Sequence, residues 1–342
     1  EGATRKLNDS QRKLRTETTQ MLADLEELVL QSYEEHEANL AAEREASAKL
    51  RAELEAAGAR VAPIPYDLPP AKFDALIGSL NGALITGGET DIKQIGSAYM
   101  NATRRLYDHS LALNATGEAW PLWGTCMGMQ VLSILGANDP AVLLSHAYSS
   151  EGQLLPLSLT PAAASSRLLC DSCLRNGAKA ILTTQNVTVN LHHDGVPPSA
   201  FAPGSALAAA FTILSTNVDT QGKAFVSTIE HASGAPIWGV QWHPERPQFE
   251  WKDSKSAVHF DHGADSIFAM FSVAARLVEE ARKSARRFAS EADEAASLES
   301  FVLRQREAGA AARGGCLFHC GRPPSAAPNH KIQSKQRSNP WH

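Results

Sequence analysis

A cysteine, a histidine and a glutamate stand in this sequence where they could perform covalent acyl transfer. Cys126 lies between Gly124 and Gly128 in the stretch WGTCMGMQVL, and a sharp turn from a strand into a helix needs such small neighbours. A helix N-terminus also favours the nucleophilic thiolate over the thiol. The alternative for Cys126 taken alone is ordinary packing, since free cysteines are commonly buried.

The partners for such a cysteine come from the stretch PIWGVQWHPERPQFEW, residues 236–251. His243 and Glu245 are two residues apart after an apolar run, so on an extended segment their side chains point to the same side. Glu245 can then hold one nitrogen of the His243 imidazole, which leaves the other nitrogen free to exchange a proton with Cys126. This is the nucleophile, base and orienting carboxylate of covalent catalysis.

A glycine pair, Gly87 and Gly88, follows a third apolar stretch in LITGGET. Flexible glycine backbone can aim an amide N–H at a developing oxyanion. The alternative is an ordinary turn at the end of a strand.

Alternating strand and helix signals from about residue 59 to 290 would position these groups. Apolar runs predict five strands, at residues 82–86, 119–123, 211–218, 224–230 and 236–242, of which the last three are close enough to be partly antiparallel. A helical run follows Cys126. Residues 265–287 predict an amphipathic helix, with an apolar stripe at Ile267, Phe268, Phe271, Ala274 and Leu277. This order predicts an α/β domain with a mostly parallel sheet, whose carboxyl edge would carry the site.

Segments of different composition flank this domain. Residues 1–58 are dense in Glu, Arg, Lys, Ala and Leu and predict a charged helical extension that ends at Gly58. Its seven-residue spacing of apolar residues fits either a short coiled coil or a single solvated helix; these residues are Leu7, Leu14, Met21 and Leu28. Residues 291–342 predict the end of a helix and a disordered tail rich in Gly, Pro and Ser.

Composition excludes several classes of protein. The 342 residues carry a formal net charge of -5, which argues against a nucleic-acid binder, and no apolar run approaches the length of about 18 residues that a membrane span needs.

Five cysteines are too few for a disulfide scaffold. A metal site that joins Cys170 and Cys173 to Cys316, His319 and Cys320 is not expected, because the two groups lie in unrelated contexts. Four sequons favour a secretory route, although no signal peptide is visible in this chain; they are at Asn8, Asn101, Asn114 and Asn186.

Together these motifs resemble class I glutamine amidotransferase domains and, more narrowly, the gamma-glutamyl hydrolase family, which trims folate polyglutamates. The narrower resemblance depends on LEAAGARVAPI, LNGALITGGETDI, WPLWGTCMGMQVLS and STIEHASGAPIWGVQWHPERPQFEW, within residues 50–290. It implies a flavodoxin-like, doubly wound sheet. It also implies a lysosomal, vacuolar or extracellular protein, and Asn101 falls where the family carries a sequon.

The resemblance also implies the roles of individual residues. Cys126 would be the nucleophile, His243 the general base and acid, and Glu245 its orienting partner. The amides of Gly88 and Met127 would form the oxyanion hole.

The family also has a functional histidine, for which VNLHHDGV offers His192 and, as the alternative, His193. Another interpretation of His192 is a loop histidine bound to water. The resemblance implies no metal and no organic cofactor, and it leaves room for a homodimer.

The predicted function is therefore a thiol hydrolase that cleaves γ-glutamyl amide bonds of folylpoly-γ-glutamates through a thioester. One alternative is a glutaminase domain that feeds ammonia to a synthase. Another is an inactive domain that serves as an assembly module.

Two features depart from the family pattern. Gln130 stands where these hydrolases often carry Glu, and the family's first apolar strand is replaced by the charged helix of residues 1–58. We expect either that the sheet closes without this strand, that another segment or a partner supplies it, or that the sequence is an incomplete gene product.

Overall fold

The computed structural model describes residues 47–251 and 260–298, together with some residues between 13 and 31. The described residues between 13 and 31 are helical, and the side chains of Met21, Leu25 and Leu28 are exposed. The choice between a coiled coil and a solvated helix stays a prediction, as do the boundaries at residues 58 and 290. The predicted disordered tail lies outside the described residues, as do Leu7, Asn8, Leu14 and the C-terminal Cys316, His319 and Cys320.

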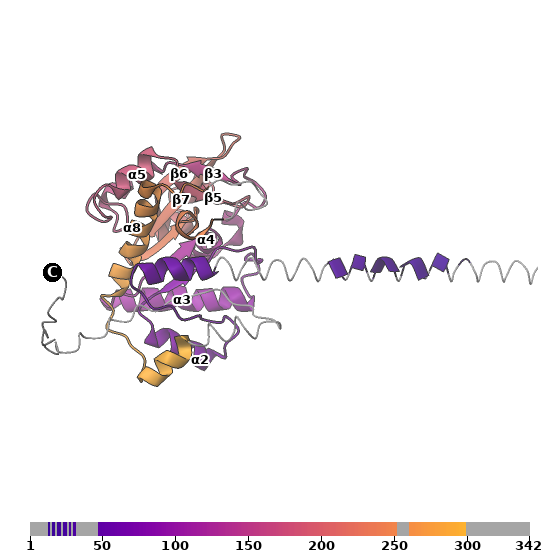
Figure 1. Cartoon of the computed structure of the whole chain (residues 1–342), viewed down its shortest axis with the longest axis horizontal. Helices are drawn as coiled ribbons and strands as arrows, with labels where there is room; N and C mark the ends of the chain where they lie inside the picture. The colour runs from indigo at the N-terminus through magenta and orange to yellow at the C-terminus, as the bar shows by residue number, and fades with distance from the viewer. Residues whose placement is uncertain are drawn as a thin grey trace, which may run out of the picture.

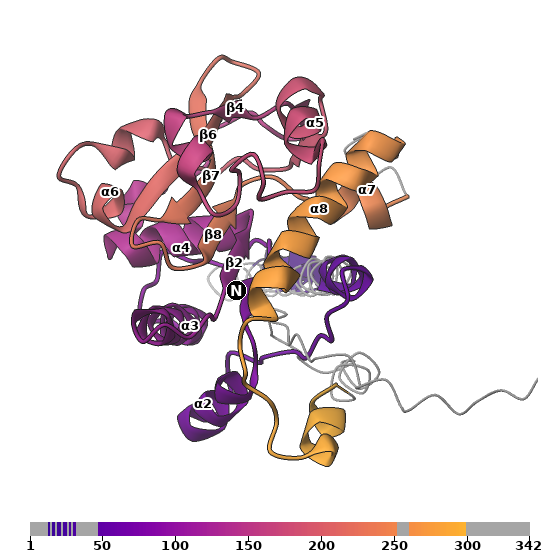
Figure 2. The same ribbon diagram turned by 90° about the vertical axis from the view of Figure 1, so that its left-hand side faces the viewer.

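A six-stranded mixed sheet forms the centre of the domain (Figure 2). Its strands, in spatial order, are β1 (Ala83–Ile85), β2 (Leu122–Thr125), β8 (Ile237–Val240), β7 (Ala224–His231), β6 (Phe211–Val218) and β4 (Ser158–Leu159). β1, β2 and β8 are parallel neighbours, whereas β7 runs against both β8 and β6, and β4 runs against β6. Four of the six strands thus point the same way, which confirms the predicted α/β class and the partly antiparallel pairing near the end of the domain.

A second, two-stranded antiparallel sheet consists of β3 (Gln153–Leu155) and β5 (Thr188–Asn190). Neither of its strands is among the five that the sequence predicts. The chain continues from β5 to His192, and the backbone N–H of His243 donates to the carbonyl of Val189 within β5 (2.9 Å). The small sheet therefore borders the segment that follows β8.

Helices cover both faces of the central sheet, as the buried runs of β1, β2 and β8 require. On β2, Leu122 packs with the residues of α3 and α4, whereas Trp123 packs with those of α8, because neighbouring strand residues point to opposite faces. Figure 2 shows α3 and α4 on one side of β2 and β8, with α8 on the other. The helices are α2 (Pro70–Ser79), α3 (Ala98–Ala115), α4 (Met127–Ala137), α5 (Ala178–Thr184), α6 (Ala206–Ala210), α7 (Arg246–Phe249) and α8 (Ala264–Ala281), with short 3₁₀ turns at Pro140–Val142, Pro161–Ser165 and Pro198–Phe201.

The predicted amphipathic helix forms, but its end and its buried face differ from the prediction. α8 ends at Ala281 rather than at residue 287, and Phe268, which was assigned to the apolar stripe, is 37% exposed. The buried face instead includes Met270 and Val273, with small residues between them. Ala274 and Leu277 of the predicted stripe are buried, but alanine and serine carry little hydrophobic signal, so the large side chains placed the centre of the buried face too close to Phe268.

The end of the N-terminal extension is a helix at residues 47–56, drawn in indigo in Figure 1, and it closes on Gly58 as expected. Gly58 has φ +90°, and the N–H of Ala59 donates to the carbonyl of Leu54, which is a left-handed helix cap. Leu50 and Leu54 are buried in the same apolar cluster as α8.

The described residues up to 58 add no strand to the sheet, in which β1 is an edge strand. Within the described ranges, the sheet therefore closes without the strand that the family pattern places there. The residues of β1 are nonetheless 0–2% exposed, because helices and the segment 59–64 enclose them.

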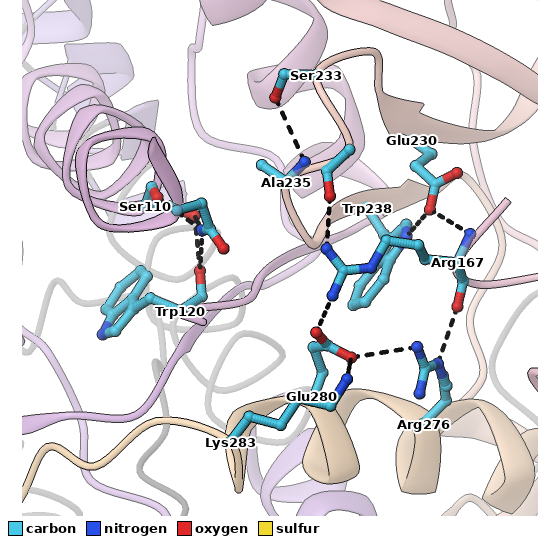
Figure 3. Close-up of polar contacts among 12 residues, drawn as sticks. Ser110, Trp120, Arg167, Glu230, Ser233, Ala235, Trp238, Arg276, Glu280 and Lys283 are labelled. Atoms are coloured by element: carbon cyan, nitrogen blue, oxygen red, sulfur yellow. Dashed lines mark hydrogen bonds and ion pairs between the residues drawn. The ribbon is translucent and has the colours of Figure 1, made fainter. Parts of the chain in front are cut away.

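A buried carboxylate on α8 helps to hold the loop that carries Arg167 against the rest of the domain (Figure 3). Glu280 of α8 is fully buried and accepts from Arg167, Arg276 (3.2 Å) and Lys283 (2.7 Å). Arg167 also donates through its backbone N–H to Glu230 (2.8 Å), which accepts from the indole of Trp238 on β8 as well. The loop that carries Arg167 is thus held to both α8 and the sheet.

We expect Glu280→Ala to lower the free energy of unfolding by about 2–4 kcal/mol, because it leaves three cations without their shared carboxylate. Glu279→Ala removes an exposed carboxylate from the same helix and serves as the control. Urea denaturation of both variants measures the effect, and equal midpoints for the two would contradict it.

Candidate active site

Cys126 occupies a strained turn at the carboxyl edge of the sheet, between β2 and α4. Its backbone has φ 52° and ψ -108°, a left-handed conformation that residues other than glycine rarely adopt. The N–H of Cys126 donates to the carbonyl of Val240 at the end of β8 (2.7 Å), and this bond fixes the turn to the neighbouring strand. The thiol is 7% exposed. The predicted elbow is confirmed as a backbone geometry.

The two glycines beside Cys126 are needed because backbone lies against them. A Cβ at Gly124 would come within 2.7 Å of the backbone nitrogen of Met129, and one at Gly128 within 2.9 Å of the carbonyl carbon of Ile85. Backbone atoms cannot move aside as the end of a flexible side chain can. The glycines let α4 begin directly against β1 and β2.

His243 and Glu245 form the expected dyad. The Nδ1 of His243 lies 2.7 Å from Oε1 of Glu245, and both side chains are buried. His243 and Cys126 lie close together. A Cβ added at Gly87 would be 3.1 Å from His243 Cε1 and 3.4 Å from Cys126 Cβ, so both side chains border the same point. The turn after β1 therefore packs against both side chains.

The electrostatics of the dyad favour a positively charged imidazole. Burial by itself would lower the pKa of His243, but the charge of Glu245 and then the charge and hydrogen bond of Cys126 raise this pKa to about 9. Burial would raise the pKa of Glu245, but the charge and hydrogen bond of His243 and the charge of Arg246 hold it below its usual value. At neutral pH the site thus holds an imidazolium between a carboxylate and the cysteine sulfur.

A glutamine that the sequence reasoning missed also contacts the nucleophile. The Nε2 of Gln241 lies 3.5 Å from Sγ of Cys126, and its Oε1 lies 3.3 Å from Nε2 of Gln130. Gln241 is two residues before His243, so the alternation that paired His243 with Glu245 would have found it. Gln130, the noted departure from the family, thus supports the amide that donates to the sulfur.

The two predicted oxyanion donors are neighbours. A Cβ at Gly88 would lie 3.2 Å from Cε of Met127, so the turn after β1 meets the first residue of α4. The first N–H groups of a helix have no intrahelical acceptor, which leaves the Met127 amide available for an anion.

His192, rather than His193, is the histidine that borders the site. The Nδ1 of His192 lies 2.9 Å from the carbonyl oxygen of Asp194, which makes Nδ1 the donor, and its buried Nε2 has no partner among the described residues. Burial is the main cause that lowers its pKa, to about 4, and the charge of His243 lowers it further. The His193 side chain is exposed, with Nε2 4.0 Å from Glu151. His192 therefore presents a neutral acceptor.

A chain of buried ion pairs, also missed from the sequence, continues outward from Glu245. Arg246 Nε lies 3.5 Å from Glu245 Oε1, and NH1 of the same arginine pairs with Glu250. Glu250 also pairs with Lys49 of helix 47–56 (2.8 Å).

The structure also describes Cys170, Cys173 and three of the four sequons. Cys170 and Cys173 form a disulfide, and no cluster of three metal-ligating side chains is found in the described ranges. Asn101 and Asn186 are exposed, whereas the amide of Asn114 donates to the carbonyls of Ser110 (2.7 Å) and Trp120 (3.2 Å). Across the same ranges, no helix is both long enough and apolar enough to cross a membrane.

Comparison with known proteins identifies the family. The sequence model of the family described as Peptidase C26 matches residues 28–245, a stretch that includes Cys126, His243 and Glu245. The chain belongs to the peptidase C26 family. This confirms the resemblance seen in the motifs, and it indicates a cysteine-dependent hydrolase.

Three curated relatives are named as gamma-glutamyl hydrolases. The chain is 34% identical to "Gamma-glutamyl hydrolase B" of Dictyostelium discoideum over 238 residues, which are 70% of this chain and 66% of that protein. It is 33% identical to "Gamma-glutamyl hydrolase" of Rattus norvegicus over 248 residues, 72% of this chain and 74% of the relative. The Homo sapiens protein of the same name is 32% identical over 246 residues, 72% of this chain and 73% of that protein.

A weaker likeness links the peptidase C26 chain to a solved structure. The glutaminase domain of Trypanosoma brucei CTPS, with bound acivicin, aligns with 65% of this chain and 79% of that one, with a TM-score of 0.41 and 15% identity. A likeness at this level carries no argument about activity.

Proposed function

We propose that this protein is a thiol hydrolase of γ-glutamyl amide bonds, with folylpoly-γ-glutamates as its substrate class. The observation that carries the proposal is the strained Cys126 turn beside the buried His243–Glu245 dyad, at the edge where β1, β2 and β8 end. The names of the curated relatives supply the γ-glutamyl specificity.

In the first half-reaction, the Cys126 thiolate attacks the γ-carbonyl carbon, and a C–S bond forms. The amides of Gly88 and Met127 stabilise the resulting oxyanion. The intermediate collapses with cleavage of the C–N bond, and the His243 imidazolium donates its proton to the leaving amine. A γ-glutamyl thioester and a neutral imidazole remain.

In the second half-reaction, the neutral His243 accepts a proton from water as the water oxygen attacks the thioester. The C–S bond then breaks, and the product leaves as a γ-carboxylic acid that ionises to the carboxylate by giving its proton to solvent. The thiolate and the imidazolium are thereby restored. Glu245 keeps His243 oriented throughout, since it holds Nδ1.

His192 is assigned to substrate binding in this proposal. Its Nε2 is a buried lone pair with no partner in the described part of the chain, and its depressed pKa keeps it unprotonated at neutral pH. Such a nitrogen accepts a hydrogen bond from a substrate N–H.

The direct test is incubation with a pteroyl-tetra-γ-glutamate and separation of the products by chain length. The proposal requires progressive shortening, with release of glutamate or γ-linked glutamate peptides. A parallel incubation with L-glutamine tests the glutaminase alternative. Ammonia release from glutamine without any cleavage of the pteroyl substrate would replace the hydrolase proposal by that alternative.

We expect Glu245→Gln to reduce kcat/KM by about 10²–10⁴-fold, because the amide no longer enforces the orientation and charge of His243. Since the negative charge of Glu245 raises the pKa of His243, its loss lowers that pKa from about 9. The alkaline limb of the pH–kcat/KM profile should therefore move to lower pH. If the alkaline limb of the variant falls at the same pH as that of the parent protein, Glu245 does not act on His243.

A lysosomal, vacuolar or extracellular location is part of the proposal. The Cys170–Cys173 disulfide fits an oxidising compartment. Among the candidate sequons, Asn101 and Asn186 are exposed and Asn114 is half-buried; the side-chain amides of Asn101 and Asn114 both donate to backbone carbonyls. Glycan release followed by mass measurement tests the three positions, and light scattering tests the homodimer.

A further inference from the structure

Helix 47–56 presents two charged side chains to the interior, where a solvated extension would have none. Lys49 and Glu53 are one turn apart, so they share a face of the helix, and both are buried. Leu50 and Leu54, next to them in sequence, are 2% exposed and belong to the apolar cluster of α8. The core therefore fixes the position of this helix.

A continuous series of ion pairs leads from Lys49 to His243. Lys49 Nζ lies 2.8 Å from Glu250 Oε2, and the two side chains are only 9% and 7% exposed. The same Glu250 oxygen pairs with Arg246, whose Nε lies 3.5 Å from Glu245 Oε1. That oxygen of Glu245 lies 2.7 Å from His243.

Cations and anions alternate along this series, in the order Lys49, Glu250, Arg246, Glu245 and the imidazolium of His243. An ionised Glu53 would be a further buried anion, and burial and then the charge of Glu245 do raise the pKa of Glu53 well above its usual range. Among the described residues, Lys49 and Arg246 are the cations that pair with Glu250.

We propose that Lys49 is a positioning residue of the catalytic site: by pairing with Glu250 it keeps Arg246 beside Glu245, the carboxylate that orients His243. Without Lys49, Arg246 is the one described cation that pairs with both Glu245 and Glu250, and its contact with Glu250 competes with its contact with Glu245. This inference rests on the proposed function, because it adds a residue to the same site. It makes the end of the N-terminal extension part of the active site.

The consequence is a shift in the titration of His243. Loss of a buried cation makes the potential at the imidazole more negative, which raises the pKa of His243. Loss of the Glu250 carboxylate removes a negative charge and therefore lowers the pKa of His243. The groups whose charges set this potential are Cys126, His192, Glu245, Arg246, Glu250, Lys49 and Glu53.

The experiment follows the His243 titration by NMR in protein with ¹⁵N-labelled histidine, with His243→Gln to assign the signal. We expect Lys49→Met to raise the midpoint by about half a pH unit or more, and Glu250→Gln to lower it by a similar amount. The double variant should return close to the parent value, as two charges of opposite sign are removed together. With a pteroyl polyglutamate as substrate, kcat of Lys49→Met should fall while KM stays near the parent value.

Two controls separate positioning from stability. Lys49→Arg keeps the charge and should restore the midpoint. Arg51→Met removes a cation from the same helix that pairs with Glu55 (2.7 Å), a residue outside the series, and should leave the midpoint unchanged. A lower melting temperature of Lys49→Met with an unshifted midpoint would overturn the proposal.

Glu250→Gln keeps the test decisive if Lys49→Met does not fold, since an unshifted midpoint in that variant also overturns the proposal. The NMR titration needs no substrate. A protein that fails to cleave the pteroyl substrate but shows the two opposite shifts would refute the proposed function and retain the role of Lys49.

Discussion

Replacement of Cys126 by alanine should abolish cleavage of γ-glutamyl amide bonds, with kcat/KM reduced by at least about 10⁴-fold. The reason is that the reaction proposed for this site has no other nucleophile: Cys126 is the one free cysteine found in the described residues, and it is the thiol beside His243. Alanine should be tolerated in the fold, because it is smaller than cysteine and the backbone bond from residue 126 to Val240 remains.

The matched control is the double variant Cys170→Ala, Cys173→Ala. It removes two sulfur atoms from a disulfide that lies outside the site, so its kcat/KM should stay within about twofold of the parent value. Circular dichroism of both proteins checks that the fold is retained. Substantial turnover by Cys126→Ala, under conditions where the double variant is fully active, would contradict a thiol mechanism.

Gly128→Ala should be strongly destabilising, at about 3 kcal/mol or more in the free energy of unfolding. A Cβ there would collide with the carbonyl group of Ile85, within 2.9 Å of its carbon. Because Ile85 is the last residue of β1 and Gly128 lies in the first turn of α4, relief of the clash must move the helix away from the sheet. Cys126 stands at the start of that helix, so activity should fall with stability.

Gly96→Ala is the control for this effect. A Cβ at Gly96 meets no atom within 4 Å, so we expect its melting temperature to remain within a degree or two of the parent. Thermal unfolding followed by calorimetry compares the two variants. A Gly128→Ala protein as stable as Gly96→Ala would show that α4 does not need its close approach to β1.

Much of the architecture around the site could be predicted from local patterns. The run at residues 211–218 became β6 with the same limits, because an apolar stretch bounded by polar turns is a local signal. The pairing of His243 with Glu245 followed from a spacing of two residues, and the Cys126 turn followed from its flanking glycines. Each of these features depends on residues that are near one another in the sequence.

The features that could not be predicted depend on contacts between distant segments. Lys49 lies in a stretch whose composition is typical of a solvated helix, and only the packing of Leu50 and Leu54 against α8 brings it to Glu250, about 200 residues later. The same packing selected the small-residue face of α8 and left Phe268 exposed. Charge composition describes the average surface of a helix, whereas tertiary contacts decide which of its charges are buried.

The central claim is that Cys126 carries the γ-glutamyl group during turnover. The most direct measurement is rapid acid quenching of the protein with a poly-γ-glutamyl substrate, followed by mass spectrometry of the peptide that contains Cys126. The proposed mechanism predicts that this peptide gains the mass of the γ-linked acyl group, and that the gain is absent from Cys126→Ala. Two results together would contradict it: no acyl group on Cys126 at any quench time while the substrate is cleaved, and cleavage by Cys126→Ala at the rate of the parent protein.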